Sequence, residues 1–267
     1  MGIITPTNKK VTKFKGVHLY HAGMSNCSMR VRMTLEEKGV PWTSHHRDLR
    51  RAENITPEYF GIHPKGLVPT LVHDGVVIIE STDIVDYLDK TFPNPPLRPT
   101  NQADLSKMYQ WLQQASKNHM CVKTYMFGNQ IGHSFRKSES ELARYRELQS
   151  NEELLAFHQK NSTDGLSAED LSNAADVLHR CFRRIDHELR SHEWIVGDDF
   201  SLADITWIPL HVTLDNARFP FDEYQNVLRW KEAIHGRPSY ESAVLNWMPK
   251  DLMAEESGHK RRPSQRN

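Results

Sequence analysis

A serine and a cysteine stand close together where a helix is predicted to begin. The residues Ser25-Asn26-Cys27-Ser28 follow a short apolar segment that predicts a strand and precede an amphipathic segment that predicts a helix. The first N–H groups of a helix have no partner within it, so this end binds and stabilises anions. A hydroxyl there can donate to a bound thiolate and lower its pKa. The alternative is that Ser25 or Ser28 only caps the helix.

A second motif, Leu67-Val68-Pro69, precedes a predicted hairpin. If the Val68–Pro69 bond is cis, the backbone N–H and C=O of Val68 can face outward and pair, like a strand, with a peptide ligand. If the bond is trans, the segment is only the entry to a strand, where a missing backbone donor is tolerated.

A third motif, Glu80-Ser81, lies between a predicted strand and a predicted helix. Ser81 is a natural N-cap, and a helix start can hold a carboxylate through this hydroxyl and backbone N–H groups. Glu80 can pair with an ammonium group. A ligand with both groups, such as the amino-acid end of a peptide, fits this pair. Simple capping by Ser81 and a surface charge at Glu80 are the alternatives.

The segments around these motifs alternate between strand and helix signals. Asp74-Gly75 lies between two β-rich runs, which is a strong hairpin signal. The order strand, helix, strand, hairpin, helix predicts a four-stranded mixed sheet in a small α/β domain. The predicted strands span 17–21, 42–48, 70–72 and 76–79, and the predicted helices span 29–38 and 81–90.

The rest of the chain is predicted to be helical almost throughout. Residues 91–100 contain four prolines and predict a linker between two domains. Beyond it, Ser201 and Asp204 predict a capping box that begins a buried helix and takes no part in chemistry. We therefore expect an all-α domain behind the α/β domain. Its predicted helices span 103–127, 138–159, 167–190, 202–216 and 224–235.

The composition argues against several classes of partner. The 267 residues carry 34 basic and 34 acidic side chains, a balance that does not favour nucleic acid or an anionic membrane. Three cysteines fit a reducing, cytoplasmic compartment. No Cys/His spacing predicts a metal site. No apolar run is long enough to span a bilayer, and the first residues lack the pattern of a secretory signal.

Taken together and in this order, the motifs resemble the glutathione transferase family. The resemblance covers about Val17 to Pro249. It implies a thioredoxin-like N-terminal domain followed by an all-helical C-terminal domain. We expect a disordered tail over 1–16, a glutathione-binding domain over 17–92, a linker over 93–101, a helical substrate-binding domain over 102–250 and a disordered tail over 251–267.

The resemblance also implies roles for single residues. Val68-Pro69, with Leu67 in the same loop, match the family's cis-proline turn, which holds the cysteinyl backbone of glutathione. Glu80 and Ser81 match the pair that holds the γ-glutamyl group. Lys65 stands where a side chain that contacts glutathione often lies, and Ser201 and Asp204 match the family's helix cap.

The segment from Ser25 to Arg32 is similar to the zeta-class pattern S-S-C-x-x-R-V-R, with Asn26 in place of its second serine. It is also similar to the segment M-S-x-C-S-M of the tetrachlorohydroquinone reductive dehalogenases. In the zeta class, the first serine activates the thiol of glutathione. In the dehalogenases, the serine supports the thiolate and the cysteine resolves a glutathionyl intermediate by disulfide exchange. A long helical insert over 136–167 and the Trp207 region also resemble these proteins and the bacterial lignin β-etherases, which displace a phenoxide with glutathione.

The activity that the resemblance implies is glutathione transfer to a small hydrophobic electrophile, an aryl ether or haloaromatic in a bacterial catabolic pathway. Ser25, Asn26 and Cys27 are the candidate catalytic residues, and Ser25 would donate to the glutathione sulfur. Cys27 could instead serve as a resolving thiol in a reductive dehalogenase or isomerase, or be a small buried group. A catalytically silent binding module is a further alternative, and the absence of C-x-x-C argues against a disulfide reductase.

Helix spacing gives candidates for the pocket that would hold the electrophile. Trp111, Gln114, Asn118 and Tyr125 recur along the predicted helix 103–127, and we expect them to line this pocket between the domains. Core packing is the alternative for Trp111. The resemblance further implies a homodimer, with glutathione as co-substrate and no metal.

Overall fold

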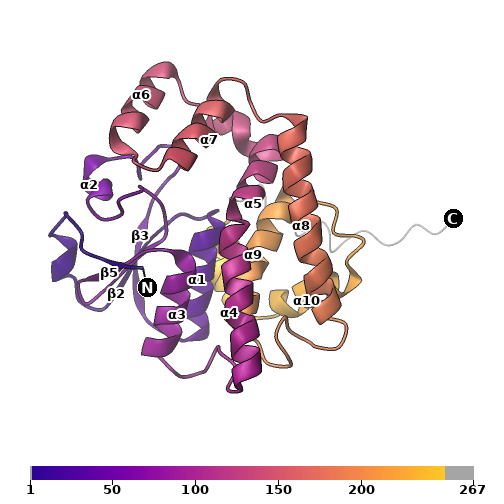
Figure 1. Ribbon diagram of the computed structural model, residues 1–267. Helices are drawn as coiled ribbons and strands as arrows, with labels where there is room; N and C mark the ends of the chain where they lie inside the picture. The colour runs from indigo at the N-terminus through magenta and orange to yellow at the C-terminus, as the bar shows by residue number, and fades with distance from the viewer. Residues whose placement is uncertain (1, 250–267) are drawn as a thin grey trace.

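The structure is a computed structural model that describes residues 2–249 of the 267-residue chain. A sheet with its covering helices forms one side of the molecule, and long helices form the other (Figure 1). No helix within the described residues is both long enough and apolar enough to cross a membrane. The predicted order of an α/β domain before an all-α domain is confirmed.

The sheet has five strands in the order β1-β5-β4-β2-β3. β2 and β3 are parallel, and the other neighbours are antiparallel. Leu19 and Leu71 are fully buried beneath the helices, while Val72 and Val77 belong to a smaller cluster on the opposite face. The strands are β1 (Ile3–Ile4), β2 (Val17–His21), β3 (Trp42–His46), β4 (Thr70–His73) and β5 (Val76–Ile78).

The first residues correct two predictions. β1 pairs with β5 through Ile3 and Ile78, so the sheet has five strands and not the predicted four. The backbone N–H of Asn8 donates to the carbonyl of Gly61 at 2.9 Å, and Val11 is buried. The predicted disordered tail over 1–16 is therefore wrong for residues 2–16. A two-residue strand is too short to show a period in the sequence, which explains the error. The predicted tail over 251–267 lies outside the described residues.

Three helices accompany the sheet: α1 (Asn26–Glu37), α2 (Pro57–Phe60) and α3 (Ser81–Thr91). α1 packs against α3 and against α9 (Leu202–Asn216), which is buried along most of its length. The predicted capping box is confirmed, since Asp204 accepts from the backbone N–H and the hydroxyl of Ser201. Asp204 also accepts from the backbone of Ile195 and from the indole of Trp230. This carboxylate joins the start of α9 to two neighbouring segments.

Two of the predicted long helices are divided. The predicted helix 103–127 is interrupted at Asn118, and the predicted helix 138–159 is interrupted around Gln149, beyond which Asn151 caps a new helix. The short α11 (Pro238–Ala243) is not predicted. The remaining helices are α4 (Gln102–Lys117), α5 (His119–Met126), α6 (Glu139–Leu148), α7 (Glu152–Ser162), α8 (Ala168–Glu188) and α10 (Gln225–His235).

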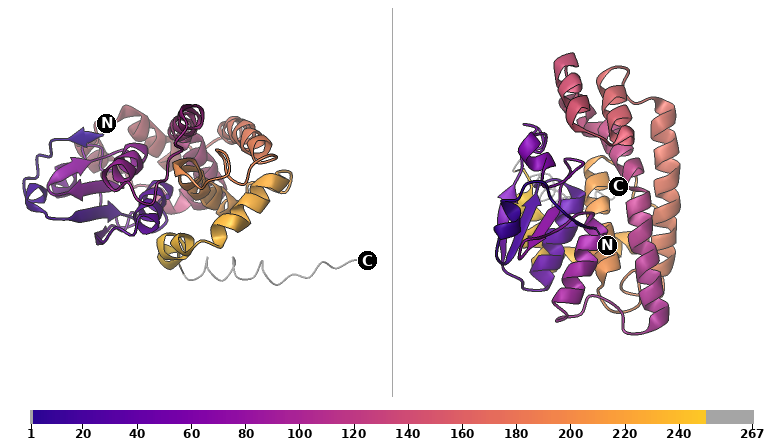
Figure 2. Two further views of the ribbon diagram at one scale, coloured as in Figure 1. Left: turned by 90° about the horizontal axis from the view of Figure 1, so that it is seen from below. Right: turned by 60° about the vertical axis from the view of Figure 1, so that its left-hand side comes forward.

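The pair α6 and α7 lies beyond the ends of α5 and α8 and near α2 of the sheet domain (Figures 1 and 2). One side chain links this helical pair to the sheet domain. Gln149, between the two helices, is buried and donates from Nε2 to the carbonyl of Lys65 at 2.6 Å. The helical domain therefore touches the loop that carries Leu67, Val68 and Pro69.

Candidate active site

A cleft of about 1190 Å³ lies between the two domains. This volume is at the upper end for small-molecule sites and leaves room for two ligands. Lys65 does not line the cleft, although its Nζ donates to Oε1 of Glu80, which does, at 3.0 Å. The structure brings the other predicted catalytic and glutathione-binding residues together on one wall: Ser25, Asn26, Cys27, Leu67, Val68, Pro69, Glu80 and Ser81.

Ser25 is the N-cap of α1, as the capping alternative predicts. Its Oγ accepts from the backbone N–H of Ser28 at 3.2 Å. Oγ of Ser28 in turn accepts from the backbone N–H of Ala22 at 3.3 Å, which closes the turn between β2 and α1. Capping uses only a lone pair of Ser25, and a hydroxyl also carries one hydrogen to donate. Ser25 can therefore cap α1 and donate to a bound thiolate at the same time.

Cys27 lies in the first turn of α1 and faces the other domain. Its Sγ is 3.8 Å from Nδ1 of His119, at the start of α5. Burial raises the pKa of the Cys27 thiol, but the charges of His119 and Arg30 and hydrogen bonds from His119 and Ser81 outweigh it and lower the pKa to about 6. Cys27 is thus a thiolate near neutral pH, a property of reactive rather than structural cysteines.

Arg30, one turn after Cys27, places a buried cation behind the cleft wall. Only 1% of its surface is exposed. Nε donates to the carbonyl of Thr206 on α9 at 3.0 Å, and Nη1 donates to Oγ of Ser81 at 3.0 Å. Nη2 is buried and has no hydrogen-bond partner among the described residues. A buried donor without an acceptor is costly, so this group is suited to a ligand.

The loop that carries Leu67, Val68 and Pro69 is held from two sides. The hydroxyl of Tyr59 donates to the carbonyl of Leu67 at 2.7 Å, and Nδ2 of Asn54 donates to the carbonyl of Gly66 at 2.7 Å. The Val68–Pro69 bond is cis, one of the two alternatives that the sequence left open.

Glu80 and Ser81 differ in detail from the prediction. Glu80, not Ser81, is the N-cap of α3, and it has a φ of 66° and no side-chain capping bond. A non-glycine residue in this region costs about 1–3 kcal/mol, and such residues cluster at ligand sites. Ser81 is the first residue of α3, and its hydroxyl accepts from Arg30 instead of capping the helix.

The four residues predicted for the electrophile pocket do not line this cleft. Trp111 is buried against Trp207, and Nε1 of Trp207 donates to the backbone carbonyl of Trp111 at 3.1 Å. Asn118 donates to Sγ of Cys181, and Tyr125 packs edge-on against Phe219. Gln114 does not line the cleft either, and its Oε1 is buried.

The error has a physical cause. Trp111 lies on the face of α4 that is buried in the core, and the break at Asn118 begins a new helix, so the spacing of one continuous helix does not carry over to Tyr125. On α5 and just beyond it, the residues that line the cleft recur at helical spacing: His119, Met120, Lys123, Met126 and Phe127.

Sequence reasoning therefore missed the residues that approach the thiol from the other side. His119 is 92 positions from Cys27, and nothing local marks it. Arg30 does carry a signal in the sequence, because it is a charged residue among the apolar positions Met29, Val31 and Met33 of a predicted helix. Within residues 2–249, no group of three or more His, Cys, Asp or Glu side chains could hold a metal ion.

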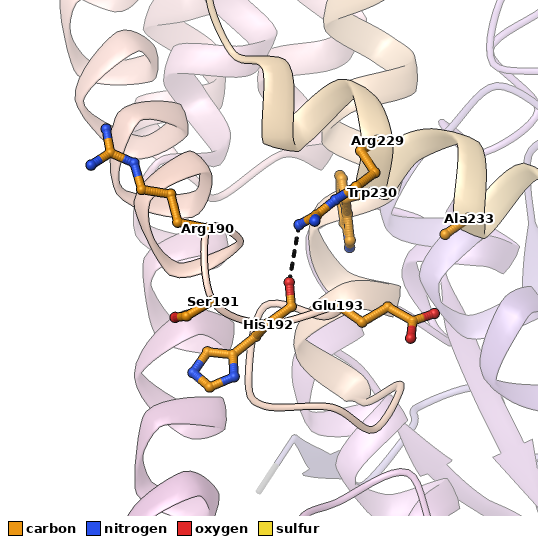
Figure 3. A pocket seen from close by; sticks show the side chains of 7 residues that line it. All are labelled: Arg190, Ser191, His192, Glu193, Arg229, Trp230 and Ala233. Atoms are coloured by element: carbon orange, nitrogen blue, oxygen red, sulfur yellow. Dashed lines mark hydrogen bonds between the residues drawn. The ribbon is translucent and has the colours of Figure 1, made fainter.

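A second hollow, of about 440 Å³, lies between the end of α8 and α10 (Figure 3). Its side chains come mostly from residues 190–193 and from Arg229 and Trp230. Arg229 donates to the backbone carbonyl of His192 at 3.1 Å, so its guanidinium ties the loop to α10. No cysteine lines this hollow, and we assign the chemistry to the larger cleft.

Comparisons with known proteins identify the family of the chain. The N-terminal domain model of glutathione S-transferase matches residues 19–96, and the C-terminal domain model matches residues 141–238. A tetrachloro-p-hydroquinone reductive dehalogenase from Sphingobium chlorophenolicum is 30% identical over 249 residues, which cover 86% of this chain and 97% of the relative. The protein LigF from Sphingobium sp. strain SYK-6 is 26% identical over 247 residues, which cover 88% and 95%.

A solved structure is similar as well. The crystal structure of the β-etherase LigF matches with a TM-score of 0.79 at 24% identity and covers 85% of this chain and 98% of that one. This likeness supports the fold, a thioredoxin-like domain with an all-helical domain behind it. The matched models, the relatives and the arrangement of the cleft agree, and the chain belongs to the glutathione S-transferase family.

Proposed function

We propose that the protein transfers glutathione to an electrophilic carbon of an aromatic substrate, an aryl ether or a haloaromatic. In this reaction the thiol of glutathione loses its proton, a C–S bond forms, and the C–O or C–halogen bond breaks with departure of phenolate or halide. The observation that carries the proposal is the convergence of Ser25, the loop over 67–69 and the Glu80-Ser81 pair on one cleft wall.

The residues of this wall have distinct proposed roles. Ser25 donates its free hydroxyl hydrogen to the glutathione sulfur and favours the thiolate, helped by the positive end of α1. The backbone of Val68 pairs with the cysteinyl unit. Ser81 and Arg30, which already share a hydrogen bond, receive the γ-glutamyl carboxylate, and Glu80 receives its ammonium group. Asn26, buried at the first position of α1, borders the same sulfur site.

Lys65 acts indirectly in this proposal, through Glu80. Its ion pair with Glu80 holds that carboxylate in place, and Gln149 holds the carbonyl of Lys65 from the helical domain. Both partners of the ion pair are exposed to a large degree, so we expect a positioning role of modest size. As part of the same proposal, the protein is a cytoplasmic homodimer, as is general for transferases of this family.

The contact between Cys27 and His119 favours a second candidate, a glutathione-dependent reductive dehalogenase. In that reaction the Cys27 thiolate attacks the sulfur of a glutathionylated substrate. The carbon–sulfur bond breaks, the carbon takes up a proton, and Cys27 and glutathione form a disulfide. The substrate gains two electrons and the two thiols lose them, and a second glutathione then regenerates Cys27. The similarity to a tetrachloro-p-hydroquinone reductive dehalogenase supports this second candidate.

Two variants separate these candidates from the silent module. We expect Ser25→Ala to lose turnover of both an aryl ether and a haloaromatic, and Cys27→Ser to keep the release of phenolate and halide. If the wild type instead converts the haloaromatic to the reduced arene, and Cys27→Ser stops at the glutathionylated arene by mass spectrometry, the dehalogenase mechanism is correct. In the transferase mechanism, both proteins accumulate the glutathionylated arene as the product. Absence of any glutathione-dependent product with the wild-type protein would contradict both candidates.

A further inference from the structure

The helical wall of the cleft carries a lysine that the proposed function does not use. Lys123 lies on α5 one turn beyond His119, and both line the cleft. Its Nζ is 3.1 Å from Nε2 of His158 on α7. The ammonium also lies over two aromatic rings, 4.4 Å from the ring centre of Phe157 and 5.4 Å from that of Phe127.

No carboxylate among the described residues pairs with this ammonium group, which hydrogen-bonds instead to the imidazole of His158. Burial, together with the charge of nearby Lys137, lowers the pKa of Lys123 to about 7, and Glu153 offsets this only in part. A half-buried cation without a paired anion is only partly solvated, and an anionic ligand in the cleft would relieve that cost.

His158 adds a second unmatched group. Burial and the charges of Lys123 and Lys137 hold the pKa of its imidazole far below the ordinary range, so the ring is neutral. An ammonium has no lone pair, so Nε2 of His158 accepts from Lys123 and the ring hydrogen lies on Nδ1. Nδ1 is buried and has no partner among the described residues. This N–H donor has no acceptor, and an oxygen atom of a ligand could supply one.

We infer that Lys123 and His158 form a recognition site for an anionic oxygen, a carboxylate or phenolate, on the aromatic substrate. The identity of this ligand as the reacting substrate rests on the proposed function, whereas the binding of an anion does not. The rings of Phe127 and Tyr145 line the cleft beside the two donors and favour an aromatic body, and Phe157 supports them from the core. Lys137, whose Nζ lies over the Tyr145 ring, adds positive charge to the same corner.

The position along α5 defines where that oxygen lies in the substrate. His119 contacts Sγ of Cys27, and Lys123 follows four residues later. At about 1.5 Å per residue, the two side chains start roughly 6 Å apart along the helix. A single aromatic ring spans a similar length. The anionic group would therefore stand across the ring from the carbon that reacts.

Binding without glutathione tests this inference directly. The probes are naphthoate and its neutral counterpart of the same shape, naphthamide, titrated into the full-length protein below pH 7, where Lys123 is protonated. We expect the wild type to bind naphthoate about tenfold or more tightly than naphthamide, since hydrogen bonds to charged groups are worth at least that ratio. A second pair, dichloronitrophenolate and its methyl ether, shows whether phenolate or carboxylate is preferred.

The variants decide which residue is responsible. Lys123→Met should bind naphthoate and naphthamide equally, while Lys117→Met, at an exposed lysine near the end of α4, should keep the full preference. Equal binding of the two probes by the wild type, or a preference that survives in Lys123→Met, would overturn the inference. Because glutathione is absent, failure to ionise glutathione would contradict the proposed function without affecting this result.

Discussion

The two walls of the cleft are held in place by different interactions. On the sheet side, backbone atoms are fixed by short hydrogen bonds, such as those that Tyr59 and Asn54 make to the loop before Pro69. On the helical side, side chains pack through rings and cations, as Lys123 does over Phe157. A backbone site keeps its shape when side chains change, whereas a side-chain site changes with each substitution. The first wall is therefore suited to a constant ligand and the second to a variable one.

The largest effect should come from Arg30, which hydrogen-bonds Ser81 on the sheet-side wall and the carbonyl of Thr206 in the helical domain. We expect Arg30→Met to lower kcat/KM by about 10³-fold, because it removes a charge beside the thiolate and an anchor of the carboxylate site. Steady-state kinetics with a neutral haloaromatic measure this. Arg30→Lys, which keeps the charge, should recover part of the loss. A decrease smaller than tenfold in Arg30→Met would place Arg30 outside the mechanism.

Ser25 tests the sheet-side wall alone. Ser25→Ala should lower kcat by about 10²-fold through loss of one donor to the sulfur. It should lower the free energy of unfolding by only about 1 kcal/mol, through loss of the helix cap. Ser25→Thr, which keeps the hydroxyl, is the control for both measurements. Unchanged turnover in Ser25→Ala, together with the expected loss of stability, would reduce Ser25 to a cap.

His119 tests the contact between the walls. The rate of Cys27 alkylation by iodoacetamide should fall as the pH falls through about 6, because the thiol form then replaces the thiolate. In His119→Gln this midpoint should move up by about one unit or more. Burial raises the pKa of Cys121 and of Cys181, the latter to about 11, so Cys27→Ser provides the blank. An identical midpoint in His119→Gln would show that the histidine does not act on the thiol.

The smallest effect should come from Gln149, which ties the helical pair to the sheet domain. Gln149→Ala should raise the KM for glutathione about fivefold, the equivalent of one ordinary hydrogen bond, with little change in kcat. Gln159→Ala is the matched control, because the side chain of Gln159 accepts from Arg146 within the helical pair and makes no hydrogen bond to the described part of the sheet domain. If both variants behave alike, the contact between the domains has no part in glutathione binding.

The same contrast explains what the sequence could predict. Ser25, Val68-Pro69 and Glu80-Ser81 were found because short spacings encode turns and helix starts, whose geometry is local. His119 and Lys123 were missed because their place in the cleft depends on the break at Asn118 and on how α5 packs against α8 and α9. Trp111 shows the same limit of prediction, since the sequence pattern of an aromatic residue on a helix is the same whether the side chain faces a ligand or the core.

The most direct test of the central claim is the ionisation of bound glutathione, followed by the ultraviolet absorbance of the thiolate across pH. The measurement is made in Cys27→Ser, so that the thiolate of Cys27 does not contribute. We expect glutathione to ionise at a lower pH when bound than when free, and the additional substitution Ser25→Ala to abolish the difference. Binding without ionisation, or ionisation that does not depend on Ser25, would contradict the central claim.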